Sequence, residues 1–108
     1  MSLRCNDITD DVAIALGEGI SLKKEIRTLD LGENKISGGG MKAVGDALKT
    51  HVRLHQLFLD NNRLSGEESA QGLAEALKNK QDLRILNLDN NNIGEEGAIH
   101  ISKNLKLV

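Results

Sequence analysis

A leucine-patterned segment that returns at nearly constant spacing constrains this chain most. Apolar residues and one Asn follow the order L-x-x-L-x-L-x-x-N-x-L, with Leu or Ile at each L, in 26–36, 54–64 and 83–93, and a truncated copy occupies 3–8. The Asn residues are 28, 28 and 29 positions apart, which indicates a repeat architecture. The spacing predicts one domain over 1–108 made of four units, 1–25, 26–53, 54–82 and 83–108.

Within a unit, the apolar period changes from that of a strand to that of a helix. Leu57 and Leu59 alternate with polar or exposed positions, which predicts a half-buried strand. The apolar residues that follow fall on one stripe of a predicted helix. Each stripe begins with a small residue, which is expected to let the helix backbone approach the strand. Ser or Thr before each stripe is expected to cap its helix. The stripes begin at Gly40, Ser69 and Gly97, the last continuing to Leu105, and the expected caps are Thr9, Ser37 and Ser65.

These segments resemble the leucine-rich repeat family, whose repeat carries the same pattern. The alternating period of 28 and 29 residues with a helix in each unit is similar to the ribonuclease-inhibitor-like subclass, as in NOD-like receptor repeats and the Ran GTPase-activating protein. The resemblance implies an α/β fold, a right-handed solenoid shaped as a short horseshoe, with a parallel sheet on the concave face and helices on the convex face. Neither end carries a polar capping unit, which predicts a piece of a longer array or end-to-end self-association.

One Asn stands where each strand ends and the backbone loses its sheet partners. A buried carboxamide there can bond the turn of its own unit and of the neighbouring unit. Because buried polar side chains normally satisfy backbone groups, we interpret this column as a structural ladder and not as a binding site. Its members are Asn6, Asn34, Asn62 and Asn91.

Strand residues that point away from the core form the candidate partner-binding surface. The family commonly binds proteins on its concave face, so the resemblance implies a protein partner there. The acidic residues of this surface favour a basic protein or peptide, with Phe58 as an anchor; alternatively, they only keep the face soluble. The candidates are Asp30, Glu33, Gln56, Phe58, Asp60, Ile85, Asn87 and Asp89.

Two alternatives to a partner-binding module remain open. Asn62-Arg63-Leu64 is similar to a tripeptide of the Ran GTPase-activating protein, in which the arginine lies near the GTPase active site. The resemblance implies that Arg63 could act as an arginine finger, which stabilises charge on a transferring phosphoryl group. A passive structural scaffold is the other alternative. No catalytic residue of the chain itself is predicted, so we expect no enzyme.

Composition argues against several kinds of ligand. The 14 Lys and Arg are outnumbered by 16 Asp and Glu, and there is one Phe with no Trp or Tyr, which argues against nucleic acid. The longest apolar run, Val12–Leu16, is too short to span a membrane. No metal-ligand motif or cofactor motif occurs, and His51, His55 and His100 are expected at the surface. A single cysteine, Cys5, favours the cytoplasm.

Overall fold

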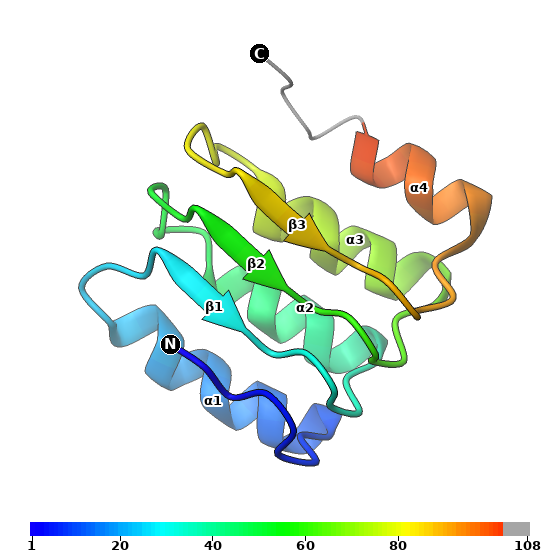
Figure 1. The fold of residues 1–108 in the computed structure, drawn as a ribbon, viewed down its shortest axis with the longest axis horizontal. Helices are drawn as coiled ribbons and strands as arrows, with labels where there is room; N and C mark the ends of the chain where they lie inside the picture. The colour runs from blue at the N-terminus through cyan, green and yellow to red at the C-terminus, as the bar shows by residue number, and fades with distance from the viewer. Residues whose placement is uncertain (103–108) are drawn as a thin grey trace.

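The computed structural model describes residues 1–102, in which helices and strands alternate along the chain (Figure 1). Each strand is followed by a helix, in agreement with the α/β order predicted from the repeat. Leu105 and the end of the predicted fourth unit lie outside the described residues. The elements are α1 (Asp10–Leu22), β1 (Thr28–Asp30), α2 (Gly38–Ala47), β2 (Gln56–Phe58), α3 (Gly66–Leu77), β3 (Ile85–Asn87) and α4 (Gly94–Ser102).

The strands form one parallel sheet in the order β1, β2, β3. Leu29 pairs with Leu57, which pairs with Leu86 on the third strand. The backbone bonds continue past the strands, since the Leu31 N–H donates to the Phe58 oxygen at 2.9 Å. This register confirms the alignment of the three complete leucine segments.

The N-terminal residues extend the sheet beyond β1. Ser2 forms a parallel bridge with Asp30, and the Leu3 N–H donates to the Asp30 oxygen at 2.7 Å. The truncated first copy of the pattern therefore lies beside β1, where a preceding strand would lie.

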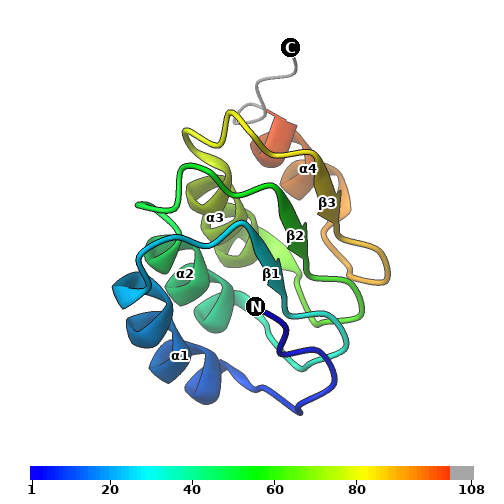
Figure 2. The same ribbon diagram turned by 60° about the vertical axis from the view of Figure 1, so that its left-hand side comes forward.

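The core lies between the sheet and the helices, because α1 to α4 all lie on one side of the sheet (Figure 2). Leu29, Leu31, Leu57 and Leu59 are at most 1% exposed. Leu86 of β3 and the flanking Leu83 and Leu88 are only partly buried, since no strand of the described chain lies beyond β3. The other side of the sheet is not covered by a helix of residues 1–102, and we call it the open face.

Small residues allow neighbouring helices to approach each other closely. A Cβ atom on Gly72 would lie 2.8 Å from the Met41 carbonyl oxygen of α2. A Cβ atom on Gly40 would lie 3.0 Å from Ile36 Cγ2 of its own leucine segment and 3.1 Å from Ala13 Cβ of α1, so this glycine lies close to both. Close backbone packing between α1, α2 and α3 thus depends on residues without bulky side chains. None of the helices in the described part of the chain is both long and apolar enough to cross a bilayer.

The expected helix caps occupy the N-cap positions but do not cap through their side chains. Thr9, Ser37 and Ser65 precede α1, α2 and α3, and none makes a side-chain cap bond. The Ser37 hydroxyl instead donates to the Asp10 carboxylate of α1, which also accepts the Ser37 N–H at 2.7 Å. The loop before α2 is therefore fixed by the preceding helix.

Candidate partner-binding surface

The open face displays side chains from all three strands. In each strand the middle leucine points into the core and its two neighbours lie on the opposite side, as the pleat requires. The strand register places these neighbours in two rows across the sheet. Five of the six are half-buried and Ile85 is 41% exposed. The rows are Thr28, Gln56 and Ile85, followed by Asp30, Phe58 and Asn87.

The acidic side of this face is partly neutralised by Arg4. The Arg4 guanidinium donates to Asp30 at 2.9 Å and to both carboxylate oxygens of Asp60 at 2.7 and 3.0 Å. It also lies 3.4 Å from Glu33 Oε2. Four side chains from three successive leucine segments therefore form one ion-pair cluster, which the sequence analysis did not anticipate.

Arg4 reaches Asp60 because the residue between them is a glycine. Arg4, Gly32 and Asp60 hold the same position in successive segments, two residues before the ladder Asn. A Cβ atom on Gly32 would lie only 2.4–2.7 Å from the Arg4 guanidinium, so a larger residue would displace it. In this column of aligned positions, a glycine stands between a basic residue and an acidic residue. This pattern is the sequence signal that could have predicted the cluster.

This cluster changes the role of Asp60. Its side chain is buried, and the residue is 6% exposed. The Arg4 guanidinium lowers the pKa of Asp60 below its ordinary value, and this effect outweighs the opposing effect of desolvation. The Asp60 carboxylate is therefore already bonded within the chain, and its contact with a partner stays a prediction. Glu33 and Asp89 remain exposed.

The ladder asparagines bond the backbone where the chain leaves each strand. Asn34 Oδ1 accepts the Ile8 N–H at 3.0 Å, and its Nδ2 donates to three carbonyl oxygens at 3.0–3.1 Å. Asn62 and Asn91 make equivalent bonds, with each Oδ1 3.0 Å from a neighbouring backbone nitrogen. Asn6 differs, because it is exposed and its Nδ2 donates only to a backbone oxygen two residues earlier, at 3.2 Å.

One histidine expected at the surface is buried. His51 is 2% exposed, its Nε2 lies 2.8 Å from the Ile20 oxygen, and its Nδ1 accepts the Ile26 N–H at 3.2 Å. His51 thus satisfies two backbone groups that a surface imidazole would leave unpaired. The Cys5 thiol is exposed and donates to Glu33 at 2.8 Å, which raises the pKa of the thiol. Within residues 1–102, no group of His, Cys, Asp and Glu side chains is arranged to hold a metal ion.

Arg63 lies at the exit of the second strand segment. Its side chain is exposed, and its N–H donates to the Ile36 oxygen at 2.8 Å. In the described structure its guanidinium makes no ion pair. The backbone of Arg63 is therefore fixed, while its side chain is open to solvent.

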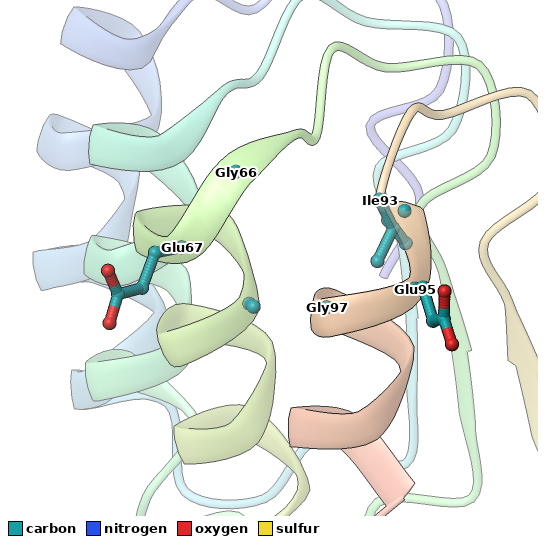
Figure 3. Close-up of a pocket in the computed structure, with 7 residues that line it drawn as sticks. Gly66, Glu67, Ile93, Glu95 and Gly97 are labelled. Atoms are coloured by element: carbon teal, nitrogen blue, oxygen red, sulfur yellow. The ribbon is translucent and has the colours of Figure 1, made fainter.

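A hollow of about 370 Å³ lies between the first turns of α3 and α4 (Figure 3). Most of the residues that line the hollow are small, and two carboxylates lie at its margin. In Figure 3 the carboxylates of Glu67 and Glu95 point away from the gap between the two helices. No set of polar side chains converges inside the hollow, so it does not have the arrangement expected of a ligand site. The lining residues are Gly66, Glu67, Ala70, Ile93, Gly94, Glu95 and Gly97.

The strand, the bonded Asn and the following helix recur in register along the chain, which defines an α/β protein built from short repeats. The family model for the Leucine Rich repeat matches residues 26–45 and 79–102. The chain belongs to the leucine-rich repeat family and is of the ribonuclease-inhibitor-like subclass.

Similar proteins support this assignment. The chain is 35% identical over 102 residues to RAN GTPase-activating protein 2 of Arabidopsis thaliana, an alignment that covers 94% of the chain and 18% of that protein. It is 34% identical over 91 residues to human NACHT, LRR and PYD domains-containing protein 13, covering 84% of the chain and 9% of that protein. It is also 26% identical over 108 residues to human NACHT, LRR and PYD domains-containing protein 5, covering 99% and 9%. The chain thus spans less than one fifth of each of these relatives.

Proposed function

We propose that this chain is a non-enzymatic protein-interaction module that binds a partner protein or peptide on its open face. The observation that carries the proposal is the uncovered sheet surface on which Phe58 and Ile85 stand among polar side chains. Aromatic and aliphatic anchors with polar neighbours are typical of protein-binding surfaces. The exposed carboxylates of Glu33 and Asp89 would attract basic groups of the partner.

A preformed surface favours such binding. We infer that the four units 1–25, 26–53, 54–82 and 83–108 follow a right-handed solenoid whose concave side is the open face. Side chains on a stacked sheet lose little conformational freedom when a partner binds, so less of the interaction free energy is lost to ordering. We place the protein in the cytoplasm, since an exposed cysteine fits a reducing compartment.

The test compares the two sides of the molecule. The double variant Phe58→Ala, Ile85→Ala removes both anchors, whereas Gln71→Ala changes an exposed residue on α3 and serves as the control. Proteins captured by the unchanged chain should be lost with the double variant and kept with the control, provided that far-UV circular dichroism shows all three folded. Equal capture by all three chains would refute binding through Phe58 and Ile85, and capture of no protein by any of them would support the passive scaffold.

A second candidate function is favoured by the similarity to RAN GTPase-activating protein 2 together with the exposed Arg63 guanidinium. In this alternative, Arg63 acts as an arginine finger on a GTPase, an effect that is worth about 10³–10⁵ in rate. Single-turnover GTP hydrolysis by Ran, with the unchanged chain and with Arg63→Ala, tests it. Acceleration that depends on Arg63 would support GTPase activation, and no acceleration would refute it.

We also propose end-to-end self-association through α1. This helix exposes Val12 and Ile14, which are 46% and 53% exposed, and Leu22, which is 80% exposed. Sedimentation velocity over a wide concentration range should show a rising mean mass that Ile14→Glu abolishes. A constant monomer mass at every concentration would exclude the association.

A further inference from the structure

The connections that lead from a helix to the next strand carry most of the positive charge of this chain. They are residues 23–27, 48–55 and 78–84, and they run side by side along the edge of the sheet at which the strands begin (Figure 1). They contain eight of the 14 Lys and Arg but only two of the 16 Asp and Glu. We call these three segments the basic edge. Since the whole chain has a formal net charge of -2, its positive and negative charges are separated along the molecule.

Two arginines and a histidine stand in register directly before the three strands. The His55 N–H donates to the Arg27 oxygen at 2.7 Å, and the Arg84 N–H donates to the His55 oxygen at 2.7 Å. Because neighbouring strands lie about 4.8 Å apart, the backbones of Arg27 and Arg84 are about 10 Å apart. Arg53 adjoins this row, since its carbonyl oxygen lies 2.7 Å from His55 Nδ1. Each of the three connections thus contributes one arginine, and all three arginines are exposed.

The acidic residues of the basic edge leave these arginines largely unneutralised. In the part of the chain that the structure describes, Arg53, Arg84 and Asp82 form no ion pair. Arg27 Nη2 lies 3.8 Å from a carboxylate oxygen of Glu25, and both side chains are exposed. Such an exposed pair contributes little free energy, so Arg27 can exchange Glu25 for another carboxylate.

Three lysines of the same segments are already occupied. Lys49 and Lys78 lie 3.8 and 2.7 Å from carboxylate oxygens of Glu75 on α3. Lys80 is 9% exposed, and its Nζ donates to the Lys78 oxygen at 2.9 Å. The charge that is open to a partner is therefore mainly that of the three arginines.

The helix ends do not account for these arginines. The negative end of a helix dipole stabilises cations within the last turn, and the last turns of α1, α2 and α3 contain no basic residue. Arg27, Arg53 and Arg84 come five, six and seven residues after the last residue of the preceding helix. Like charges at neighbouring positions also do not stabilise a sheet. The fold itself thus gains nothing evident from this row of charge.

From this arrangement we propose that the basic edge binds an acidic segment of a partner protein, with carboxylates over Arg27, Arg53 and Arg84. The planar guanidinium group matches a carboxylate, which it binds through two parallel N–H bonds. The spacing of about 10 Å equals the length of a run of about four residues in an extended chain. Val52, which is 48% exposed and precedes Arg53, offers this segment an apolar contact. The basic edge is a second surface, with the opposite charge preference to the open face.

Nucleic acids and anionic membranes match the basic edge less well. None of its residues is aromatic, so it lacks the side chains on which the bases of a single strand stack. Its large exposed apolar residues are Val52 and the adjoining Leu22 of α1. Two such residues fall short of the continuous apolar face with which a helix lies in a membrane surface. A carboxylate-rich peptide needs neither feature.

Three synthetic peptides of about 12 residues test this proposal against the full chain labelled with ¹⁵N. The first carries four consecutive Glu followed by Leu in a Gly and Ser background, the second has Gln in place of each Glu, and the third has the composition of the first with its Glu residues dispersed. At low ionic strength the first peptide should bind about fivefold more tightly than the second and about twofold more tightly than the third, and salt should reduce both differences. Amide shifts in nuclear magnetic resonance spectra should be centred on residues 23–27, 48–55 and 78–84.

Charge reversal in the protein makes the test specific. Arg27→Glu, Arg53→Glu and Arg84→Glu should each weaken binding of the first peptide about threefold or more. Lys42→Glu is the matched control, because Lys42 is exposed on α2, forms no ion pair in the described chain and undergoes the same change of charge. The control should change the affinity by less than about twofold. Far-UV circular dichroism checks that each variant is folded.

Several results would overturn the proposal. Equal binding of the Glu and Gln peptides would refute recognition of carboxylates, and an equal effect of Lys42→Glu would show attraction by net charge alone. Tighter binding of phosphatidylserine vesicles or of a thymidine oligonucleotide than of the first peptide, lost in the arginine variants, would assign the basic edge to a membrane or to nucleic acid. Absence of shifts in the three connections at millimolar peptide would refute the proposal outright.

The outcome is separate from that of the proposed function. The variant Phe58→Ala, Ile85→Ala should bind the first peptide as the unchanged chain does, because the basic edge lies outside those two positions. If this double variant loses the peptide while the arginine variants keep it, the acidic segment binds the open face and the proposal is wrong. Loss of captured proteins with the same double variant decides the proposed function by itself.

Discussion

Replacing Asn62 by alanine is the substitution whose cost the structure defines most closely. The side chain is buried, with the residue 9% exposed. Its Oδ1 accepts the Ile36 N–H at 3.0 Å. Its Nδ2 donates to the carbonyl oxygens of Leu31, Leu59 and Asp60 at 2.9, 3.1 and 3.3 Å.

The free-energy cost of losing each hydrogen bond in Asn62→Ala depends on whether the partner group keeps another hydrogen bond. The Leu31 and Leu59 oxygens keep a second donor each, from the Asn34 and Asn91 carboxamides at 3.0 and 2.9 Å. Loss of bonds to groups that remain partnered should cost about 1 kcal/mol in total. The buried Ile36 N–H loses its acceptor, and an unsatisfied buried donor costs about 1–3 kcal/mol. We therefore expect the free energy of unfolding to fall by about 2–4 kcal/mol.

Urea unfolding followed by far-UV circular dichroism measures this loss, because the chain has no Trp or Tyr for fluorescence. Asn6→Ala is the matched control, since Asn6 holds the same repeat position but is exposed. We expect that control to change the free energy of unfolding by no more than about 0.5 kcal/mol, as is usual for surface residues. Equal losses for the two variants, or a loss below about 1 kcal/mol for Asn62→Ala, would refute the argument from buried hydrogen bonds.

Four further substitutions test the packing and the electrostatics. Gly72→Ala should cost about 1–3 kcal/mol in urea unfolding because its Cβ would lie 2.8 Å from a carbonyl oxygen of α2; Gly19→Ala, with no atom within 4 Å of its Cβ, should be neutral or stabilise by up to about 1 kcal/mol, and the opposite order would contradict this packing. His51→Ala should cost about 2–4 kcal/mol because two backbone groups lose their partner, and a loss typical of a surface residue would argue against its burial. Because the pKa of Asp60 is lowered in the folded chain, its stabilisation is complete above the unfolded-state pKa and is lost as the pH falls through the lower folded value. Acid titration should show stability falling below about pH 4, less steeply in Arg4→Met, and identical profiles would mean that the Arg4 pair does not stabilise the fold.

The order of elements and the strand register could be predicted because they follow from burial alone. Leu57 and Leu59 must point to one side of a strand, and their repetition in the neighbouring segments fixes which residues lie side by side. A slip of one residue would expose every one of these leucines to water. The sheet pairing of Leu29, Leu57 and Leu86 is therefore encoded in the spacing of the pattern.

The burial of His51 could not be predicted in the same way. It lies in the connection between α2 and β2, where the sequence has neither a strand period nor a helix period. Its environment is set by the Ile20 oxygen in the last turn of α1 and by the Ile26 N–H in the connection between α1 and β1. The partner groups are backbone atoms, so no side-chain pattern in the sequence reports them.

The charge of the open face depends on side-chain reach, which a column of aligned residues does not show. Read as a column, Asp60 and Asp89 are equivalent acidic residues at successive strand exits. The Arg4 side chain is long enough to pass over Gly32 and to bond Asp60, and it makes no bond to Asp89. Two residues that look alike in the alignment are thus buried and paired in one case and exposed and unpaired in the other.

This difference locates where selectivity can arise in a chain made of similar units. Some positions carry the same residue in every segment, such as the strand leucines and the ladder asparagines. Their side chains pack or bond the neighbouring units together, so they cannot distinguish one partner from another. Selectivity requires positions at which the segments differ and whose groups remain unbonded. On the open face these conditions are met at Asp89, which is exposed and forms no ion pair within residues 1–102, whereas Arg4 bonds the carboxylates of Asp30 and Asp60. A change of charge at Asp89 should therefore alter partner choice without altering the fold, and the same change at Asp60 should alter the fold first.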